Sequence, residues 1–351
     1  MGVHCEINLF KPSDGVFIPG STVSGIIKYA VDEETVFNKI DVSLKGNGRL
    51  VIRDQTRKRR QNMYIYRNSE EYVDIENIVH NDDKAPPLPV GLYEFPFNFT
   101  LPHSIPASLN YLRRNARYRV RCVITYYISI KFHRPGLFQF AKKFKKEITV
   151  ATVIKPRLPM EPTIYGEQKT LFQLFSRKPN VVNIKANIEN CVIDLGGRIN
   201  INYEIFNHTN LNLKGVETKL VEIYTFTTKG HRKVRLSKDI ENTDTKTGSI
   251  SSGESQNMDI AINVPSELGS LEYSNLVSRD YFVYITAIIP FPHTNAELEV
   301  PLQIGDRNDP SQETVDDPPP SYWEVMAEDQ KKEGQEENED EGDDESDGEK
   351  S

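Results

Sequence analysis

Short segments of alternating apolar and polar residues fill most of the chain up to about residue 304, and Pro, Gly and Asn separate them. Basic residues alternate with apolar ones between residues 117 and 124, and the same period of two returns over residues 199–205. Residues 281–289 are apolar or aromatic almost throughout. A period of two is that of a β-strand, and helical periodicity is almost absent. The pattern therefore predicts an all-β protein built from short antiparallel strands, as in sandwiches or barrels.

Two changes along the chain divide it into segments. Prolines at positions 156, 159, 162 and 179 flank a stretch without clear alternation, and all alternation ends near residue 305. Each of the two alternating segments is long enough for one sandwich. The predicted organisation is a first β-sandwich at residues 1–153, a linker at 154–180, a second β-sandwich at 181–304 and a tail at 305–351.

The tail differs sharply in charge from the rest of the chain. Residues 305–351 contain 19 acidic and 4 basic residues, whereas the preceding part contains 39 basic and 32 acidic ones. Its last residues, QEENEDEGDDESDGEKS, hold too few apolar side chains to offset the entropy lost on ordering. The sequence thus predicts a mildly basic folded body and a disordered acidic tail. Within this tail, Ser346 is a candidate site for an acidophilic kinase.

The cysteines and histidines give little sign of metal or catalytic chemistry. The three cysteines are widely spaced and form no CxxC pair, and the seven histidines belong to no HExxH, GxSxG or phosphate-loop motif. The first ten residues lack the basic and apolar regions of a signal peptide, and no apolar stretch reaches the roughly 18 residues of a membrane span. We therefore expect a cytoplasmic, non-enzymatic protein without a metal or cofactor.

Five segments resemble the arrestin-domain-containing proteins, or α-arrestins, in sequence, order and spacing. They are residues 17–25 (FIPGSTVSG), 91–102 (GLYEFPFNFTLP), 117–122 (RYRVRC), 196–199 (GGRI) and 300–305 (VPLQIG). The resemblance implies two arrestin-type, immunoglobulin-like β-sandwiches in tandem. It also implies an adaptor that contacts the tails of membrane-protein cargo, peripherally at the plasma membrane and endosomes.

The tail contains a PPxY motif, formed by Pro319, Pro320, Ser321 and Tyr322, and Trp323 follows it as the one tryptophan of the chain. Consecutive prolines favour a polyproline II helix whose rings fill the aromatic grooves of WW domains, and the tyrosine ring fills a second pocket. A Trp in an acidic tail has no core to serve, which favours a binding role over a Pro-rich spacer. In the resembling family, this motif implies recruitment of HECT-type ubiquitin ligases that carry WW domains.

Basic residues form three clusters that could bind cargo or another anion. They are Arg57, Lys58, Arg59 and Arg60 in one loop, Arg117, Arg119 and Arg121 on one face of a predicted strand, and Lys142, Lys143, Lys145 and Lys146. Such clusters favour phosphates, anionic lipid or acidic peptides, and peripheral contact with an anionic membrane is one expectation. The alternative is a solvated face that keeps sheet edges from aggregating. Nucleic acid is not expected, because neither an aromatic platform nor a recognition helix accompanies the clusters.

These features predict an adaptor that links receptors or transporters to WW-domain ubiquitin ligases for ubiquitination, endocytosis and trafficking. One alternative is a chaperone or scaffold whose acidic tail screens the charge of basic clients; such a tail needs no PPxY motif. Another is a tandem immunoglobulin-like adhesion protein, which the missing signal peptide and unpaired cysteines disfavour. An enzyme of unknown type is the remaining alternative.

Overall fold

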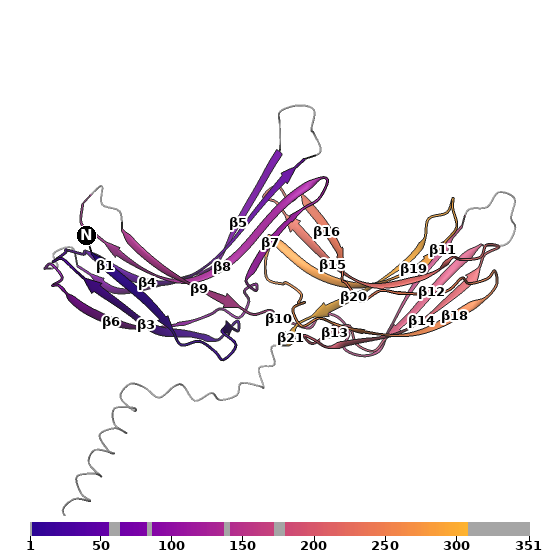
Figure 1. Cartoon of the computed structure of the whole chain (residues 1–351), viewed down its shortest axis with the longest axis horizontal. Coiled ribbons are helices and arrows are strands. Elements are labelled where there is room, and N and C mark those ends of the chain that lie inside the picture. The colour runs from indigo at the N-terminus through magenta and orange to yellow at the C-terminus, as the bar shows by residue number, and fades with distance from the viewer. Residues whose placement is uncertain (1, 56–63, 83–85, 137–140, 172–179, 308–351) are drawn as a thin grey trace, which may run out of the picture. The chain divides into compact units, whose positions relative to one another are not determined.

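The computed structural model describes residues 2–55, 64–82, 86–136, 141–171 and 180–307 (Figure 1). Within these ranges, every regular element is a β-strand and none is a helix. The strands form two β-sandwiches in sequence order, so the predicted all-β class and tandem arrangement are confirmed. The same ranges contain no helix with the length and apolarity needed to cross a membrane.

One layer of the first sandwich is a three-stranded antiparallel sheet in the order β1-β3-β6. Its strands are β1 (Val3–Leu9), β3 (Thr22–Val31) and β6 (Gly91–Thr100). The central strand alternates strictly, with Val23 and Ile27 buried and Lys28 exposed. Gly25 lies on the buried side, where a Cβ would stand 2.1 Å from the backbone oxygen of Asn8, so only glycine fits there.

The other layer of the first sandwich is a six-stranded sheet in the order β2-β9-β8-β4-β5, with β7 beside β8. Its strands are β2 (Val16–Phe17), β4 (Lys39–Asp54), β5 (Tyr64–Asn81), β7 (Leu109–Arg114), β8 (Tyr118–His133) and β9 (Lys142–Val150). Even-numbered residues of β4, such as Leu44, Leu50 and Ile52, are fully buried. The odd-numbered residues therefore project from the outer face of this sheet.

The second sandwich also has two layers, which enclose the fully buried rings of Tyr203 and Tyr281. A four-stranded sheet has the order β11-β12-β14-β18, and a six-stranded sheet has the order β13-β20-β19-β15-β16, with β17 beside β15. The strands of the first are β11 (Thr163–Thr170), β12 (Val181–Ile188), β14 (Arg198–His208) and β18 (Ser255–Asn263). Those of the second are β13 (Val192–Ile193), β15 (Gly215–Thr227), β16 (Lys233–Asp239), β17 (Thr245–Lys246), β19 (Val277–Ile288) and β20 (Ala296–Ile304).

Apolar and polar contacts join the two sandwiches. The ring of Tyr111 on β7 lies 4.4 Å from that of Tyr224 and 5.0 Å from that of Phe226, measured between centroids, and both partners belong to β15. The core of the first sandwich therefore continues into the second. Arg232, in the turn between β15 and β16, reaches the first sandwich and pairs with Asp54 at 3.3 Å. The turn between these strands is thus held against the first sandwich.

The segment between the sandwiches is shorter than the predicted linker. Residues 163–170 fall inside the predicted span, yet they form β11, which pairs along its whole length with β12. β11 is an edge strand with mostly exposed side chains, including Ile164 at 62% exposure, so its apolar periodicity is weak. At the other end, β21 (Asp306–Arg307) lies beyond the predicted end of the second sandwich and pairs in parallel with β10 (Val153–Ile154).

Asn207, near the end of β14, organises a buried loop of the second sandwich. It is fully buried, and its Nδ2 donates to the carbonyl oxygens of Leu211, Ile250 and Ser251 at 2.8, 3.2 and 2.9 Å. Its Oδ1 accepts from the backbone N–H and the hydroxyl of Thr209. The side-chain amide is therefore committed to structural hydrogen bonds on both sides.

Candidate functional site: an arginine face on the first sandwich

Arginines line up across neighbouring strands on the outer face of the six-stranded sheet of the first sandwich. Arg119 of β8 stands opposite Arg53 of β4 on one side and opposite Arg114 of β7 on the other. Residues that stand opposite each other in a ladder project from the same face. Arg121 follows two residues along β8 and shares that face. We call the whole exposed set the arginine face: Arg49, Arg53, Arg67, Arg114, Arg119 and Arg121.

The local sequence places these side chains outward. In β4, Leu50 and Ile52 are fully buried, so Arg49 and Arg53 on either side of them project to the opposite face. In β8, buried Val120 directs Arg119 and Arg121 outward in the same way. Arg119 and Arg121 thus share one face of a strand, as the alternation predicts.

No acidic partner neutralises the arginine face within the described residues, where none of its members forms an ion pair or a side-chain hydrogen bond. Like charges directly opposite each other destabilise a sheet. Arg119 makes two such pairs, with Arg53 and with Arg114. These exposed guanidinium groups are therefore solvated and accessible to an anion from outside the chain.

The far end of the same outer face is different, because its charges are paired. Lys39 donates to Glu76 at 2.5 Å, and this hydrogen bond raises the pKa of the lysine and lowers that of the carboxyl. Buried Asp41 lies 2.6 Å from His133 and 3.8 Å from Lys131. The contrast between the two ends shows that the missing partners are a local property of the arginine face.

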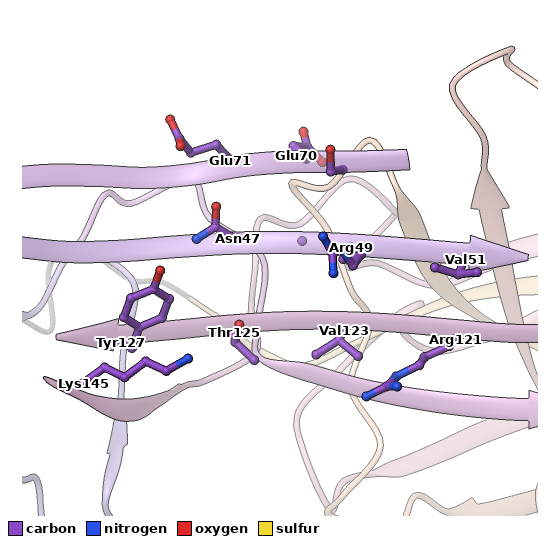
Figure 2. Close-up of a pocket in the computed structure, with 12 residues that line it drawn as sticks. Asn47, Arg49, Val51, Glu70, Glu71, Arg121, Val123, Thr125, Tyr127 and Lys145 are labelled. Atoms are coloured by element: carbon purple, nitrogen blue, oxygen red, sulfur yellow. The ribbon is translucent and has the colours of Figure 1, made fainter. Parts of the chain in front are cut away.

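An open hollow of about 1050 Å³ lies on this outer face and spans β5, β4, β8 and β9 (Figure 2). Arg49 and Arg121 lie toward one end of the hollow, and Tyr127 and Lys145 lie toward the other (Figure 2). The Nζ of Lys145 is 5.2 Å from the centroid of the Tyr127 ring, a cation–π distance. Glu70 and Glu71 of β5 also line the hollow, so its lining carries both basic and acidic side chains.

Arg117 does not belong to the strand in which the alternation placed it. β8 begins at Tyr118, and Arg117 lies in the preceding turn, where its backbone N–H donates to Oδ1 of Asn115 at 2.9 Å. Its guanidinium stacks over the Tyr118 ring, 4.9 Å from the centroid. Arg117 thus precedes β8 by one residue, in the Asx turn that connects β7 to β8, and its backbone oxygen accepts from the N–H of Gln55 at 2.7 Å.

Several predicted site residues lie outside the described residues. They are Arg57, Lys58, Arg59 and Arg60 of the basic loop, Pro319, Pro320, Ser321, Tyr322 and Trp323 of the PPxY segment, and Ser346. The basic loop follows Arg53 closely in the chain, so these cations belong to the same stretch of sequence as the arginine face.

The described residues bring together groups suited to binding anions. They contain no group of three His, Cys, Asp or Glu side chains that could hold a metal ion. Cys122 lies under the arginine face but is fully buried, and burial raises the pKa of its thiol to about 12. A thiol with that pKa is protonated at neutral pH and is a poor nucleophile.

Two domain profiles match the chain in the order of its two sandwiches. The N-terminal domain of arrestin, or S-antigen, matches residues 5–156, and the arrestin C-terminal domain matches residues 178–308. The chain belongs to the arrestin-domain-containing proteins. It is 22% identical over 302 residues to Arrestin domain-containing protein 17 of Caenorhabditis elegans, and the alignment covers 81% of this chain and 68% of that protein.

The family assignment confirms the resemblance drawn from the sequence and the tandem arrestin-type sandwiches that it implied. Arrestin domains are found in non-enzymatic adaptor proteins. The chain is therefore an adaptor-like protein of the arrestin family. The arginine face lies within the part of the chain that matches the arrestin N-terminal domain.

Proposed function

We propose that this arrestin-domain protein is a non-enzymatic adaptor that links membrane cargo to WW-domain HECT-type ubiquitin ligases. Ubiquitination of the cargo, followed by its endocytosis and trafficking, is the expected result. The observation that carries the proposal is the PPxY motif ending at Tyr322 in a chain whose body consists of two arrestin domains. The protein acts by binding two partners at once, and the recruited enzyme performs the chemistry.

The body supplies the cargo side of the proposed link. The arginine face presents guanidinium groups without acidic partners in the described residues, and Arg binds carboxylate and phosphate groups through two parallel hydrogen bonds. It therefore suits an acidic or phosphorylated tail of a receptor or transporter. Such cargo would place the protein in the cytoplasm, peripherally at the plasma membrane and endosomes.

The tail supplies the ligase side of the proposed link. Pro319, Pro320 and Tyr322 have the spacing that WW grooves recognise, and Trp323 adds an apolar ring beside them. A contact of this size is weak, with a dissociation constant in about the micromolar range. Several WW modules in one ligase, or clustering of cargo at a membrane, would raise the effective concentration and make the link stable.

A bridging experiment tests both sides of the proposal. Beads carrying a multiply phosphorylated peptide are incubated with the full chain and then with a purified WW-domain ligase. We expect ligase on the beads only when the adaptor is present. Tyr322→Ala should abolish ligase capture while the adaptor stays on the beads, and the double variant Arg119→Gln, Arg121→Gln should remove both proteins. Equal ligase capture by all three adaptors contradicts the proposal.

A further inference from the structure

Apolar side chains lie among the arginines on the outer face of the first sandwich. They are Leu112 of β7, Val123 of β8, Val51 of β4 and Ile65 of β5. Each of them stands opposite a member of the arginine face in its ladder, so all four project from that face. Leu112 is 62% exposed and Ile65 is 36% exposed. We call these four residues the apolar stripe.

The register between the strands makes the stripe continuous. Leu112 and Val51 stand opposite Arg121 from its two sides, and Val123 follows two residues along the same strand. Val123 is therefore a diagonal neighbour of both, at about 7–8 Å, and Ile65 is a diagonal neighbour of Val51 in the same way. The stripe crosses three strand spacings, or about 14 Å. Val51 and Val123 also line the open hollow on this face (Figure 2).

The same register places arginines along both sides of the stripe. They are Arg53, Arg114 and Arg121 on the side toward the β7–β8 turn, and Arg49 and Arg67 on the other side. Within the described part of the chain, none of them pairs with an acidic side chain. Glu71 stands opposite Asn47, beyond Arg49, so it lies outside this belt of arginines. The stripe is thus bordered by unpaired cations on both sides.

This arrangement differs from ordinary surface exposure of apolar residues. Single exposed apolar side chains are common on proteins, and Ile164 on β11, at 62% exposure, is one example. Here four apolar residues from four strands are contiguous, and positive charge surrounds them. The complementary surface has apolar residues in its middle and carboxylates along both of its sides.

We propose that the apolar stripe and its flanking arginines bind a short amphipathic helix of a partner protein, with Asp or Glu on both flanks of its apolar side. The stripe lies on the face of a sheet, where the ladders already use the backbone N–H and C=O groups. A ligand on this face must satisfy its own backbone groups, and a helix does so internally. At a rise of 1.5 Å per residue, the stripe matches about nine or ten helical residues. Apolar residues at i, i+3 and i+7 would lie along it.

This inference rests on the adaptor proposal and names the class of cargo segment that the arginine face receives. A phosphorylated tail needs only the guanidinium groups, whereas an acidic amphipathic helix also needs the apolar stripe. Variants of the stripe therefore separate the two kinds of cargo. Neither kind involves Tyr322, so the ligase side of the adaptor is tested separately.

The test measures peptide binding to the full chain by fluorescence anisotropy at about 150 mM salt, where exposed charges are largely screened. The probe is a synthetic helical peptide of about sixteen residues, with Leu at i, i+3, i+7 and i+10 and Glu on both sides of this row. A control peptide has the same composition in an order that removes the row. The wild-type chain should bind the probe at least about tenfold more tightly than the control peptide, because only the probe buries apolar area on the stripe.

Two substitutions test the stripe while keeping every arginine. Leu112→Gln should weaken binding of the probe about tenfold, and Val51→Thr, which removes one methyl group, about fourfold. Ile164→Gln is the matched control, because Ile164 has the same exposed fraction as Leu112 but lies on β11 of the second sandwich. It should change the affinity less than about twofold.

The outcomes distinguish this inference from the adaptor proposal. Equal binding of the two peptides, or wild-type affinity in both stripe variants, overturns the inference. If only the double variant Arg119→Gln, Arg121→Gln loses affinity for the probe, the inference is overturned and the adaptor proposal stands. Leu112→Gln and Val51→Thr should still be captured by beads carrying the multiply phosphorylated peptide. Loss of that capture in both would mean that the stripe does not act separately from the arginines, which also overturns the inference.

Discussion

Arg119→Glu should raise the stability of the protein and weaken its binding to anions at the same time. Arg119 stands between Arg53 and Arg114, so the substitution turns two repulsive cross-strand pairs into two attractive ones. Each cross-strand charge pair contributes roughly 0.2–1 kcal/mol, and exposed pairs lie at the low end because water screens them. The two changes together amount to about 1 kcal/mol, which corresponds to a rise of about 2–4 °C in the thermal midpoint of a domain of this size.

The assays are thermal unfolding and flotation with anionic vesicles, both at 150 mM salt. Lys185→Glu on β12 is a control of opposite sign, because Lys185 stands opposite Glu204 and the substitution creates a like-charge pair. It should lower the thermal midpoint and leave vesicle binding unchanged. The reasoning is refuted if Arg119→Glu destabilises the protein by as much as Lys185→Glu does, because Arg119 would then have a stabilising partner.

Two further predictions concern buried groups. Asn207→Ala should lower the free energy of unfolding by about 3 kcal/mol or more, since it leaves three carbonyl oxygens without their donor; a change below about 1 kcal/mol in urea unfolding would contradict the network. Cys122, whose pKa is raised to about 12, should react with a thiol reagent at pH 8 roughly a thousandfold more slowly in the native than in the unfolded chain. Because its native pKa exceeds the unfolded value, its ionisation also favours unfolding as pH rises above about 9, and fast native labelling would contradict this burial.

The sequence predicted the β class, the two sandwiches and the outward face of β8, because period-two alternation records which side of a strand is buried. It did not reveal Arg49, Arg53, Arg67 and Arg114 as partners of Arg119. Their meeting depends on the register between strands that are far apart in the chain, and alternation within one strand carries no information about that register.

Local chemistry explains the other places where the structure differs from the prediction made from the sequence. Arg117 satisfies the alternation, but it lies one residue before β8, in the turn where Oδ1 of Asn115 accepts its backbone N–H. β11 lies within the predicted linker because an exposed edge strand needs few apolar residues and so shows little alternation. The hollow lined by Arg49, Arg67 and Lys229 could not be predicted, since these residues meet only through the packing of one sandwich against the other.

The most direct test of the adaptor account is a calorimetric titration of the full chain with the tandem WW domains of a HECT-type ubiquitin ligase. The account predicts binding in about the micromolar range, loss of binding in Tyr322→Ala, and unchanged binding when residues 330–351 are deleted. The deletion removes most of the acidic run and leaves the PPxY motif intact. The opposite result, in which Tyr322→Ala binds normally and the deletion abolishes binding, would contradict the account and favour a charge-screening tail.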